Sequence, residues 1–413
     1  MCVASAMVTQ WPAVLDPSDP IPSCPVNNNK LNLSNPDCTW AADYDEARQK
    51  FLLATTKHAS SVESLQVGEG LFVDVAVFKG RSDQLVLHLA GIHGVEAYVG
   101  SAIQISMAPL LANLTLEQQQ QPPTVILVHA LNPFGMKYSR RTNENNVDLN
   151  RNTLFSEKDE AYRSRDPNIA GYETFNPVFN PSGPPNWPGF LIWVAELVTS
   201  LIKHGFGSFR QALITGSYTR SKGIYYGGSK LENSHIVLRD FLQRRGYLQS
   251  VKQLILIDVH SGLGKYGRDT IMVDSGFKHD YLFNSARNAP DFLHWSPPVE
   301  IERLDGSTKG SDATVGYALT VGVSTDGYPS LFKHPEFRCA AVAQEFGTVA
   351  PIIVAWTSIH ENQAWQYGSD ADRASMGKRL KRVFSPSSKS FLYSILPRGQ
   401  IVLFQAIKGI NEV

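Results

Sequence analysis

The 413-residue sequence is poor in several features that mark particular classes of protein. It has only four Cys, too few for a small domain held together by disulfides. Lys+Arg equals Asp+Glu at 38 each, so no overall charge attracts nucleic acid or an anionic membrane. It also lacks a basic run with interleaved aromatic residues. These absences argue against a nucleic-acid-binding protein and against a disulfide-rich module.

Long hydrophobic runs are missing as well. The most apolar stretches, residues 190–194 and 349–356, are far too short to cross a bilayer. The N-terminal stretch has no basic residue ahead of its mildly apolar part, so no secretory signal is expected. We therefore expect no membrane span and a cytoplasmic location, although Cys24 and Cys38 could pair in an oxidising compartment. The oligomeric state is left open.

What the sequence does contain fits a globular α/β protein, with 43% hydrophobic and 18% charged residues. Residues 1–40 are rich in Pro, Asn and Ser and predict an extended lead-in. No clear linker divides residues 41–413, which predicts a single catalytic domain. Strand and helix patterns alternate there, which indicates an α/β sandwich with a mixed, mostly parallel sheet.

The expected elements follow from hydrophobic periodicity. Short apolar or alternating runs predict strands at residues 71–78, 85–90, 125–129, 253–259, 270–274 and 340–346. Helical spacing predicts helices at residues 43–57, from the His93 segment toward 111, and at 190–202, 231–244 and 358–383. Pro, Asn and Gly throughout residues 152–189 predict a loop, and residues 217–228 read in the same way.

The strongest chemical signal lies in LVLHLAGIHGVEAYVG, residues 85–100. His93 and Glu96 follow a buried strand, at the end of the sheet where ligands bind in open α/β folds. An imidazole and a carboxylate three residues apart can both turn toward one metal ion. Alone, the pair could equally be a surface pair or a capped helix start, so the rest of the chain must supply support.

That support comes from further polar residues placed just after predicted strands. A hydrolytic zinc site needs three protein ligands and one open position, and His93, Glu96 and His260 form such a set. Glu345 is then the candidate general base. Arg141 is the candidate for stabilising the oxyanion, in competition with its neighbour Arg140.

The segment Asp148-Leu149-Asn150-Arg151 adds a binding function. The guanidinium of Arg151 and the amide of Asn150 suit a substrate carboxylate, and Arg140 is a further candidate for the same role. Asp148 is expected to accept a hydrogen bond from a ligand histidine, His93 above all, and so to fix its tautomer.

Other candidates have simpler interpretations. His88 and His129 lie within apolar runs and are expected to be hydrogen-bonded core residues. Tyr225 and Tyr226 lie in a loop-like segment, where they could be exposed to substrate or simply form a turn. A serine hydrolase is disfavoured because the sequence has no Gly-x-Ser-x-Gly motif.

The ordered set His-x-x-Glu, Arg, Asp-x-Asn-Arg, His, Glu resembles the M14 zinc carboxypeptidase superfamily, whose cytosolic-carboxypeptidase and aspartoacylase-like branches share the DLNR string. Four segments are similar to sequences of the M14-like DUF2817 family: GIHGVEAYVGSA, HALNPFGMKYSRRTNENNVDLNRN, DVHSGLG and EFGT. The similarity runs from about residue 42 to 365. It implies a carboxypeptidase-like three-layer α/β/α fold that binds one Zn²⁺ per chain.

Residue by residue, the resemblance supports the ligand, base, oxyanion and carboxylate-binding roles given above. Tyr317 is the candidate for the mobile tyrosine that carboxypeptidases carry over the terminal carboxylate of the substrate. No residue is assigned to the specificity pocket. The expected function is zinc-dependent hydrolysis of C–N amide bonds in a peptide or acyl-amino-acid substrate. The alternatives are an N-acyl amino acid deacylase of the aspartoacylase type and a non-catalytic zinc-binding protein of the same fold.

Overall fold

The computed structural model describes residues 18–26, 30–117, 121–156, 159–274, 278–283, 300–303 and 319–413. One eight-stranded sheet in the order β1-β2-β4-β3-β5-β8-β6-β7 organises the described chain. Its strands are β1 (Ser61–Gly68), β2 (Leu71–Phe78), β3 (Arg81–Ala90), β4 (Pro123–His129), β5 (Gln253–Tyr266), β6 (Asp269–Val273), β7 (Glu300–Arg303) and β8 (Arg338–Gly347).

The sheet is mixed and mostly parallel, as predicted. Strands β4, β3, β5 and β8 form three successive parallel pairs, and β6 pairs with β7 in parallel. The antiparallel pairs are β1 with β2, β2 with β4, and β6 with β8. Because β3, β5 and β8 are parallel neighbours, their carboxyl ends meet at one edge of the sheet.

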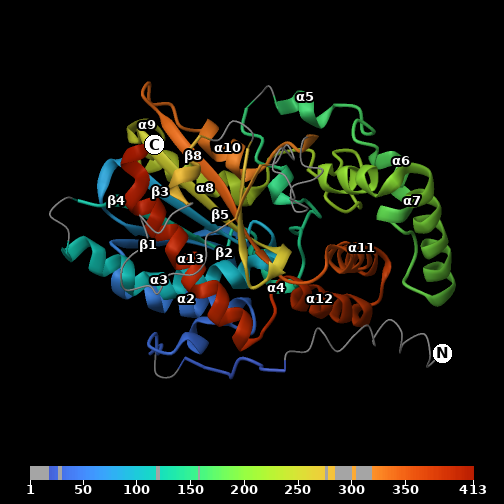
Figure 1. Cartoon of the computed structure of the whole chain (residues 1–413), viewed down its shortest axis with the longest axis horizontal. Helices are drawn as coiled ribbons and strands as arrows, with labels where there is room; N and C mark the ends of the chain where they lie inside the picture. Colours follow the sequence, from blue (N-terminus) through green and yellow to red (C-terminus); the bar gives the residue numbers. More distant parts are fainter. Residues whose placement is uncertain are drawn as a thin grey trace.

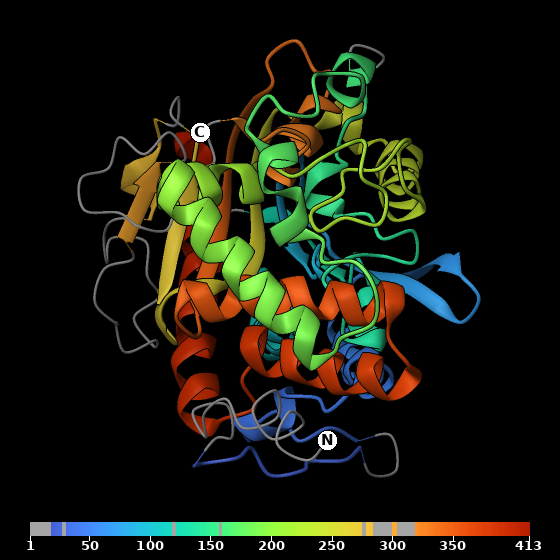
Figure 2. The ribbon, with the colours of Figure 1, turned by 90° about the vertical axis from the view of Figure 1, so that its right-hand side faces the viewer.

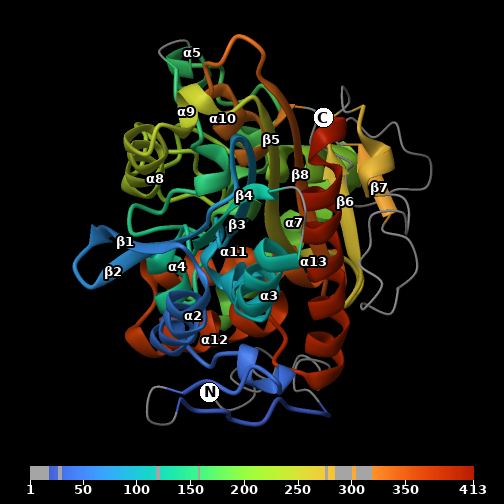
Figure 3. The same ribbon diagram turned by 90° about the vertical axis from the view of Figure 1, so that its left-hand side faces the viewer.

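Helices cover both faces of the sheet, which gives the expected three layers (Figures 1 and 3). Residues that alternate along a strand point to opposite faces, so Val86 packs in one core and Leu85 and Leu87 in the other. The first face is covered by α2 (Tyr44–His58), α3 (Ala97–Glu117) and α13 (Lys389–Gly409). The second is covered by α8 (Asn233–Arg244), α9 (Tyr247–Ser250) and α10 (Ser324–Ser330).

The predicted strands are all present, whereas β1, β7 and α13 were not predicted from the sequence. The single helix expected at residues 358–383 is wrong, because two helices, α11 (Pro351–Tyr367) and α12 (Asp370–Phe384), occupy this region. Ser369 starts α12 with a capping box to Asp372. The loop expected at residues 152–189 also contains the short helices α5 (Glu160–Arg163) and α6 (Tyr172–Phe179).

Helix α7 (Trp187–Thr215) is longer than predicted and bends at Gly205. With α6 and α11 it forms a separate, aromatic-rich core beside the sheet. Figure 2 shows α7, in light green, lying diagonally over the orange-red α11. The residues Phe175, Trp193, Phe209 and Ile359 belong to this core.

Two helices in the described chain have the length and apolar composition that a membrane crossing requires. The stretch Gly94–Leu114 is 78% buried within the protein, as expected of a core helix. The other, α7, is only 6% buried over its most apolar window. The absence of a membrane span therefore stays a prediction for α7.

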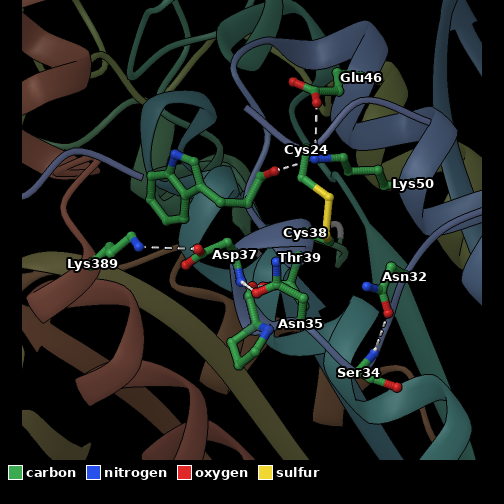
Figure 4. The surroundings of a disulfide bond; sticks show 12 residues. Cys24, Asn32, Ser34, Asn35, Asp37, Cys38, Thr39, Glu46, Lys50 and Lys389 are labelled. Atoms are coloured by element: carbon green, nitrogen blue, oxygen red, sulfur yellow. Dashed lines mark hydrogen bonds and ion pairs between the residues drawn. A yellow bond between two sulfur atoms is a disulfide. The ribbon is translucent and has the colours of Figure 1, made fainter. Parts of the chain in front are cut away.

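The described part of the N-terminal lead-in is fastened to the rest of the chain. Cys24 and Cys38 form a disulfide across a sequence separation of 14 residues (Figure 4). Lys389, at the start of α13, lies 3.4 Å from Asp37. Disulfides are typical of oxidising compartments, so the cytoplasmic location remains a prediction without support from this feature.

Candidate metal centre

A tight turn at the end of β3 places His93 and Glu96. Gly91 adopts a positive φ of 73°, which allows the chain to leave the sheet directly after Ala90. The 3-10 turn η3 (Gly94–Glu96) then packs against the backbone of α4 (Pro133–Tyr138). A Cβ atom at Gly94 would lie 2.0 Å from the carbonyl carbon of Gly135, so only glycine fits this close approach.

His93, Glu96 and His260 lie together although 164 residues separate Glu96 from His260. His93 Nδ1 lies 3.0 Å from Glu96 Oε1, and His260 Nδ1 lies 3.2 Å from Glu96 Oε2. Their donor atoms all lie within 4.8 Å of one another, and the three residues are 3%, 2% and 4% exposed. This metal centre, as we call the three residues, fits a metal ion with two imidazole nitrogens and a carboxylate.

Two aspartates hold the far side of each imidazole. Asp148 Oδ1 lies 3.1 Å from His93 Nε2, and Asp258 Oδ2 lies 2.9 Å from His260 Nε2. If each Nε2 donates its hydrogen to an aspartate, both Nδ1 atoms carry the lone pair that a metal needs. Arg141 Nη2 also lies 2.7 Å from His93 Nε2, and a nitrogen that donates to Asp148 cannot accept this contact as a hydrogen bond.

The charges around the metal centre are strongly coupled. Burial opposes ionisation of Glu96, but His93, His260 and Arg141 outweigh it and hold its pKa below the ordinary value. Burial likewise disfavours the charged form of His260, yet the carboxylates of Asp258 and Glu96 raise its pKa well above the ordinary value. The two carboxylates therefore favour the charged imidazolium form of His260 in the metal-free protein, and a metal would displace its second proton.

Glu345 lies beside the metal centre because of the register between β5 and β8. In this parallel pair His260 is directly opposite Glu345. The Leu263 backbone N–H donates to Glu345 Oε1 at 2.8 Å and orients the carboxyl group. Burial, together with the negative charge of Glu96, raises the pKa of Glu345 to about 7. The group can therefore take up or release a proton near neutral pH.

Arg141 reaches into the metal centre from the segment after α4. It donates to Glu96 Oε1 at 3.1 Å and to Asp148 Oδ2 at 2.9 Å. Its guanidinium also lies over the ring of Tyr225, 4.5 Å from the centroid. These contacts fix a positive charge next to the metal centre while leaving the side chain 12% exposed.

Asn150 and Arg151 also line the cavity, but part of their hydrogen-bonding capacity is already used. Arg151 donates from Nε and Nη2 to the Ile214 carbonyl at 3.0 and 2.6 Å, and from Nη1 to the Asn150 carbonyl at 2.7 Å. Asn150 Oδ1 accepts from the Ser324 N–H at 2.9 Å. One hydrogen on each Arg151 Nη and the amide group of Asn150 remain for a ligand.

Arg140 lies apart from the cavity-lining residues that the structure describes. Its Nε donates to Glu361 at 2.8 Å, and Nη2 donates to Asn146 and Asn362. The ion pair is buried, with the side chains of Arg140 and Glu361 1% and 6% exposed, which holds Arg140 away from the cavity. The position of Tyr317 lies outside the described residues.

The histidines expected in the core are there. His88 Nδ1 lies 3.1 Å from the Gln104 amide, and His129 Nε2 lies 2.9 Å from the Ser101 hydroxyl. Tyr225 and Tyr226 lie in the predicted loop, and of the two alternatives left open for them the structure disfavours broad exposure, since each is 8% exposed. Tyr225 nevertheless lines the cavity, beneath Arg141.

Asp258 and Ser324 are parts of the site that the sequence analysis did not assign. Asp258 holds His260, and the Ser324 hydroxyl donates to Asp258 in turn. Alternation along a strand could have indicated Asp258, since residues two apart point to the same face. Ser324 gives no such signal, because its position depends on the folding of α10 against β5.

A cavity of about 110 Å³ opens onto these residues. Its polar lining, which we call the polar floor, consists mainly of the metal centre, Glu345, Arg141, Asn150 and Arg151. Its walls are apolar and include Phe206, Phe209, Leu213, Met272, Ile352 and Phe384. The arrangement can therefore hold a metal ion, a proton acceptor and a partly apolar ligand in one place.

Comparison with known proteins identifies the family. A family model described as "Protein of unknown function (DUF2817)" matches residues 40–398, most of the chain. The chain belongs to the DUF2817 family. This match confirms the family named from the motifs and extends it beyond residue 365. A search of curated proteins finds no match to this DUF2817 protein.

Several solved structures are similar to this DUF2817 protein at low identity. Carboxypeptidase A from Helicoverpa armigera is 14% identical, with 86% of this chain and 74% of that chain covered and a TM-score of 0.42. A metallo-carboxypeptidase from Pseudomonas aeruginosa is 12% identical, with 89% and 69% covered and a TM-score of 0.43. Thrombin activatable fibrinolysis inhibitor is 16% identical, with 82% and 74% covered and a TM-score of 0.41.

Proposed function

We propose that this DUF2817 protein is a zinc-dependent hydrolase of C–N amide bonds with a carboxypeptidase-like mechanism. One observation carries the proposal: Glu345, whose pKa is raised to about 7, lies opposite His260 of the metal centre. His93, Glu96 and His260 would hold the ion, a His₂Glu set that suits catalytic zinc. Bound zinc would supply a Lewis acid that polarises the scissile carbonyl and acidifies water.

Glu345 serves as the general base in this proposal. Its carboxylate takes a proton from the attacking water and passes it to the leaving nitrogen. Burial, which raises the pKa of Glu345 in the metal-free protein, helps the carboxyl group to hold the proton between the two steps. The hydrogen bond from the Leu263 N–H fixes Oε1, so the second oxygen is the one that faces the reacting atoms.

The arginines and Asn150 bind the substrate. Arg141 places its positive charge where the carbonyl oxygen becomes negative. The remaining Nη hydrogens of Arg151 and the amide group of Asn150 bind a free carboxylate beside the scissile bond. Arg140 is left out because it does not line the cavity and is buried in an ion pair with Glu361.

An N-acyl amino acid deacylase is the second candidate, with the same chemistry. It is favoured by the apolar walls of the cavity, which suit an acyl group better than a chain of peptide units. The two candidates can be distinguished by the rates at which the protein hydrolyses C-terminally blocked peptides, free peptides and acyl-amino acids. Cleavage of blocked and free peptides at equal rates would contradict the carboxylate-binding role of Arg151.

The test of the proposed function combines metal analysis with Glu345→Gln. We expect about one zinc per chain, loss of hydrolysis on chelation and its return with zinc. Glu345→Gln should keep the zinc but lose roughly 10³-fold in kcat, within the range for general-base catalysis. Glu336→Gln, a surface carboxylate paired with Lys252, is the matched control.

Two results would contradict the proposal. Full hydrolytic activity after exhaustive chelation would exclude a role for a metal ion in the reaction. Unchanged turnover in Glu345→Gln, with zinc still bound, would exclude Glu345 as the general base. Zinc binding without hydrolysis of any substrate in the panel would favour the non-catalytic zinc-binding protein.

A further inference from the structure

A second cavity lies between α7 and α11, next to the first. Its volume is about 200 Å³, and its described lining residues are all aliphatic or aromatic. We call it the apolar groove. It is formed mainly by Trp193, Val194 and Leu197 of α7 and by Ile353, Trp356 and Ile359 of α11.

The apolar groove adjoins the cavity that holds the metal centre. Phe209, Ile352 and Ala355 line both of them. Ile352 is 51% exposed, so this junction is open to solvent. Water gains no hydrogen bonds from such a lining, so the groove favours an apolar occupant.

The direction of the apolar groove indicates which part of a substrate would enter it. Arg151 bonds to the carbonyl of Ile214, at the C-terminal end of α7. The groove is lined by residues 190–197 of the same helix, beyond its bend at Gly205, and by Phe209, which also lines the first cavity nearer to Ile214. A substrate whose carboxylate is bound at Arg151 would therefore extend its opposite end, the acyl side of the scissile amide, toward the groove.

We infer that the apolar groove binds the aliphatic chain of an N-acyl amino acid, and that medium- to long-chain N-acyl amino acids are the preferred substrates. This rests on the proposed function and narrows it. From Ile352 to Ile359 helix α11 rises by about 10 Å, the length of roughly eight extended carbons. Hydrolysis adds water across the amide: the oxygen joins the acyl carbon, the C–N bond breaks, and a fatty carboxylate and a free amino acid form.

The test is a series of N-acyl derivatives of one amino acid, from acetyl to dodecanoyl. We expect kcat/KM to rise by up to about fourfold per added methylene, as each enters the groove, and to level off near eight carbons. Hydrolysis of acetyl and longer substrates at equal kcat/KM would overturn the groove assignment while leaving the proposed function intact. No hydrolysis of any member, with peptides cleaved, would also overturn it. No hydrolysis of either class would instead contradict the proposed function.

Two neighbouring residues of α7 give a matched pair of variants. Leu197 lines the apolar groove, whereas Val198 is 50% exposed on the outer side of the helix. Leu197→Glu should remove most of the chain-length preference while the acetyl substrate is hydrolysed at the wild-type rate. Val198→Glu should leave both unchanged. An equal loss in the two variants would overturn the assignment.

A binding measurement without catalysis provides a second readout. Trp193 and Trp356 line the apolar groove, so an occupant should change their fluorescence. Decanoate titrated into the metal-free protein should give a saturable change that is lost in Leu197→Trp, which fills the groove without adding charge. Saturable binding that persists unchanged in Leu197→Trp would place the fatty chain elsewhere and contradict the inference.

Discussion

The metal centre and the apolar groove lie in two adjoining cavities but are built in opposite ways. The metal centre lies at the carboxyl ends of β3 and β5, where the turn after Ala90 places His93 and Glu96 and the pairing of β5 with β8 places His260. The groove lies between two helices outside the sheet, and side-chain packing alone forms its lining. In the proposed function, chemistry that tolerates little displacement would depend on the sheet and the turns at its end, and selection of the substrate on the helices outside it.

Changes at the polar floor should lower the rate of hydrolysis of every substrate equally, whereas changes in the apolar groove should lower it only for substrates with long acyl chains. Arg141→Lys is expected to have the largest effect. Lysine keeps the charge but loses the planar fork, so kcat should fall about 10²- to 10³-fold for acetyl and decanoyl substrates alike. Steady-state kinetics on both substrates measure this.

The adjacent Arg140→Lys is the control for that variant. Because Arg140 is buried against Glu361, its replacement should lower the free energy of unfolding by about 1–3 kcal/mol and leave kcat intact. Chemical denaturation and kinetics together distinguish the two arginines. A large loss of kcat in Arg140→Lys without loss of stability would mean that the substrate contacts both.

Asp258→Asn should have the next largest effect. Asparagine can no longer fix the His260 tautomer by accepting a charged hydrogen bond, so metal affinity should fall about 10- to 100-fold. At saturating zinc the chain-length preference should match that of the wild type, because the groove is untouched. A changed preference at saturating zinc would show that the two regions are coupled.

The pH dependence of metal affinity gives a smaller, graded effect. Because the pKa of His260 is raised in the metal-free protein, zinc must displace its proton whenever the pH lies below that pKa. Apparent affinity should therefore rise with pH, by about tenfold per unit while one proton is released, and level off above the pKa. Competition with a chromophoric chelator from pH 6 upward measures it. A pH-independent affinity would contradict a protonated His260.

Reduction of the Cys24–Cys38 disulfide should have the smallest effect on activity, because it lies away from both regions. Opening a loop of this size should lower the free energy of unfolding by about 3 kcal/mol. Thermal unfolding with and without reductant measures this loss, and Cys24→Ser should reproduce it. Equal kinetic constants in the two states would support the separation of this segment from substrate selection.

Much of the sheet and of the metal centre could be predicted from the sequence. His93, Glu96, His260 and Glu345 each stand at the end of an apolar strand, and parallel pairing brings such ends together. A local sequence signal also marks the break between α11 and α12, namely the capping sequence that begins at Ser369. It was missed because apolar residues continue on both sides of it.

The features that could not be predicted depend on partners far away in the chain. Arg140 and Arg141 are equivalent in the sequence, and only Glu361, 221 residues later, decides that Arg140 is structural. The apolar groove depends on α7 packing against α11, more than a hundred residues apart. No local pattern encodes such a contact, so neither the groove nor a substrate preference follows from periodicity or motif.

The beginning of the described chain is hydrogen-bonded to a segment next to the wall of the cavity that holds the metal centre. The Lys389 N–H donates to the carbonyl of Asp19, and the Ile21 N–H donates to that of Ser387. Phe384, which lines the cavity, lies only three residues before Ser387, and its carbonyl accepts from Ser261, next to His260. A protease cut between residues 21 and 24 would separate residues 19–21 from the Cys24–Cys38 disulfide, so that non-covalent contacts alone would hold them against this wall.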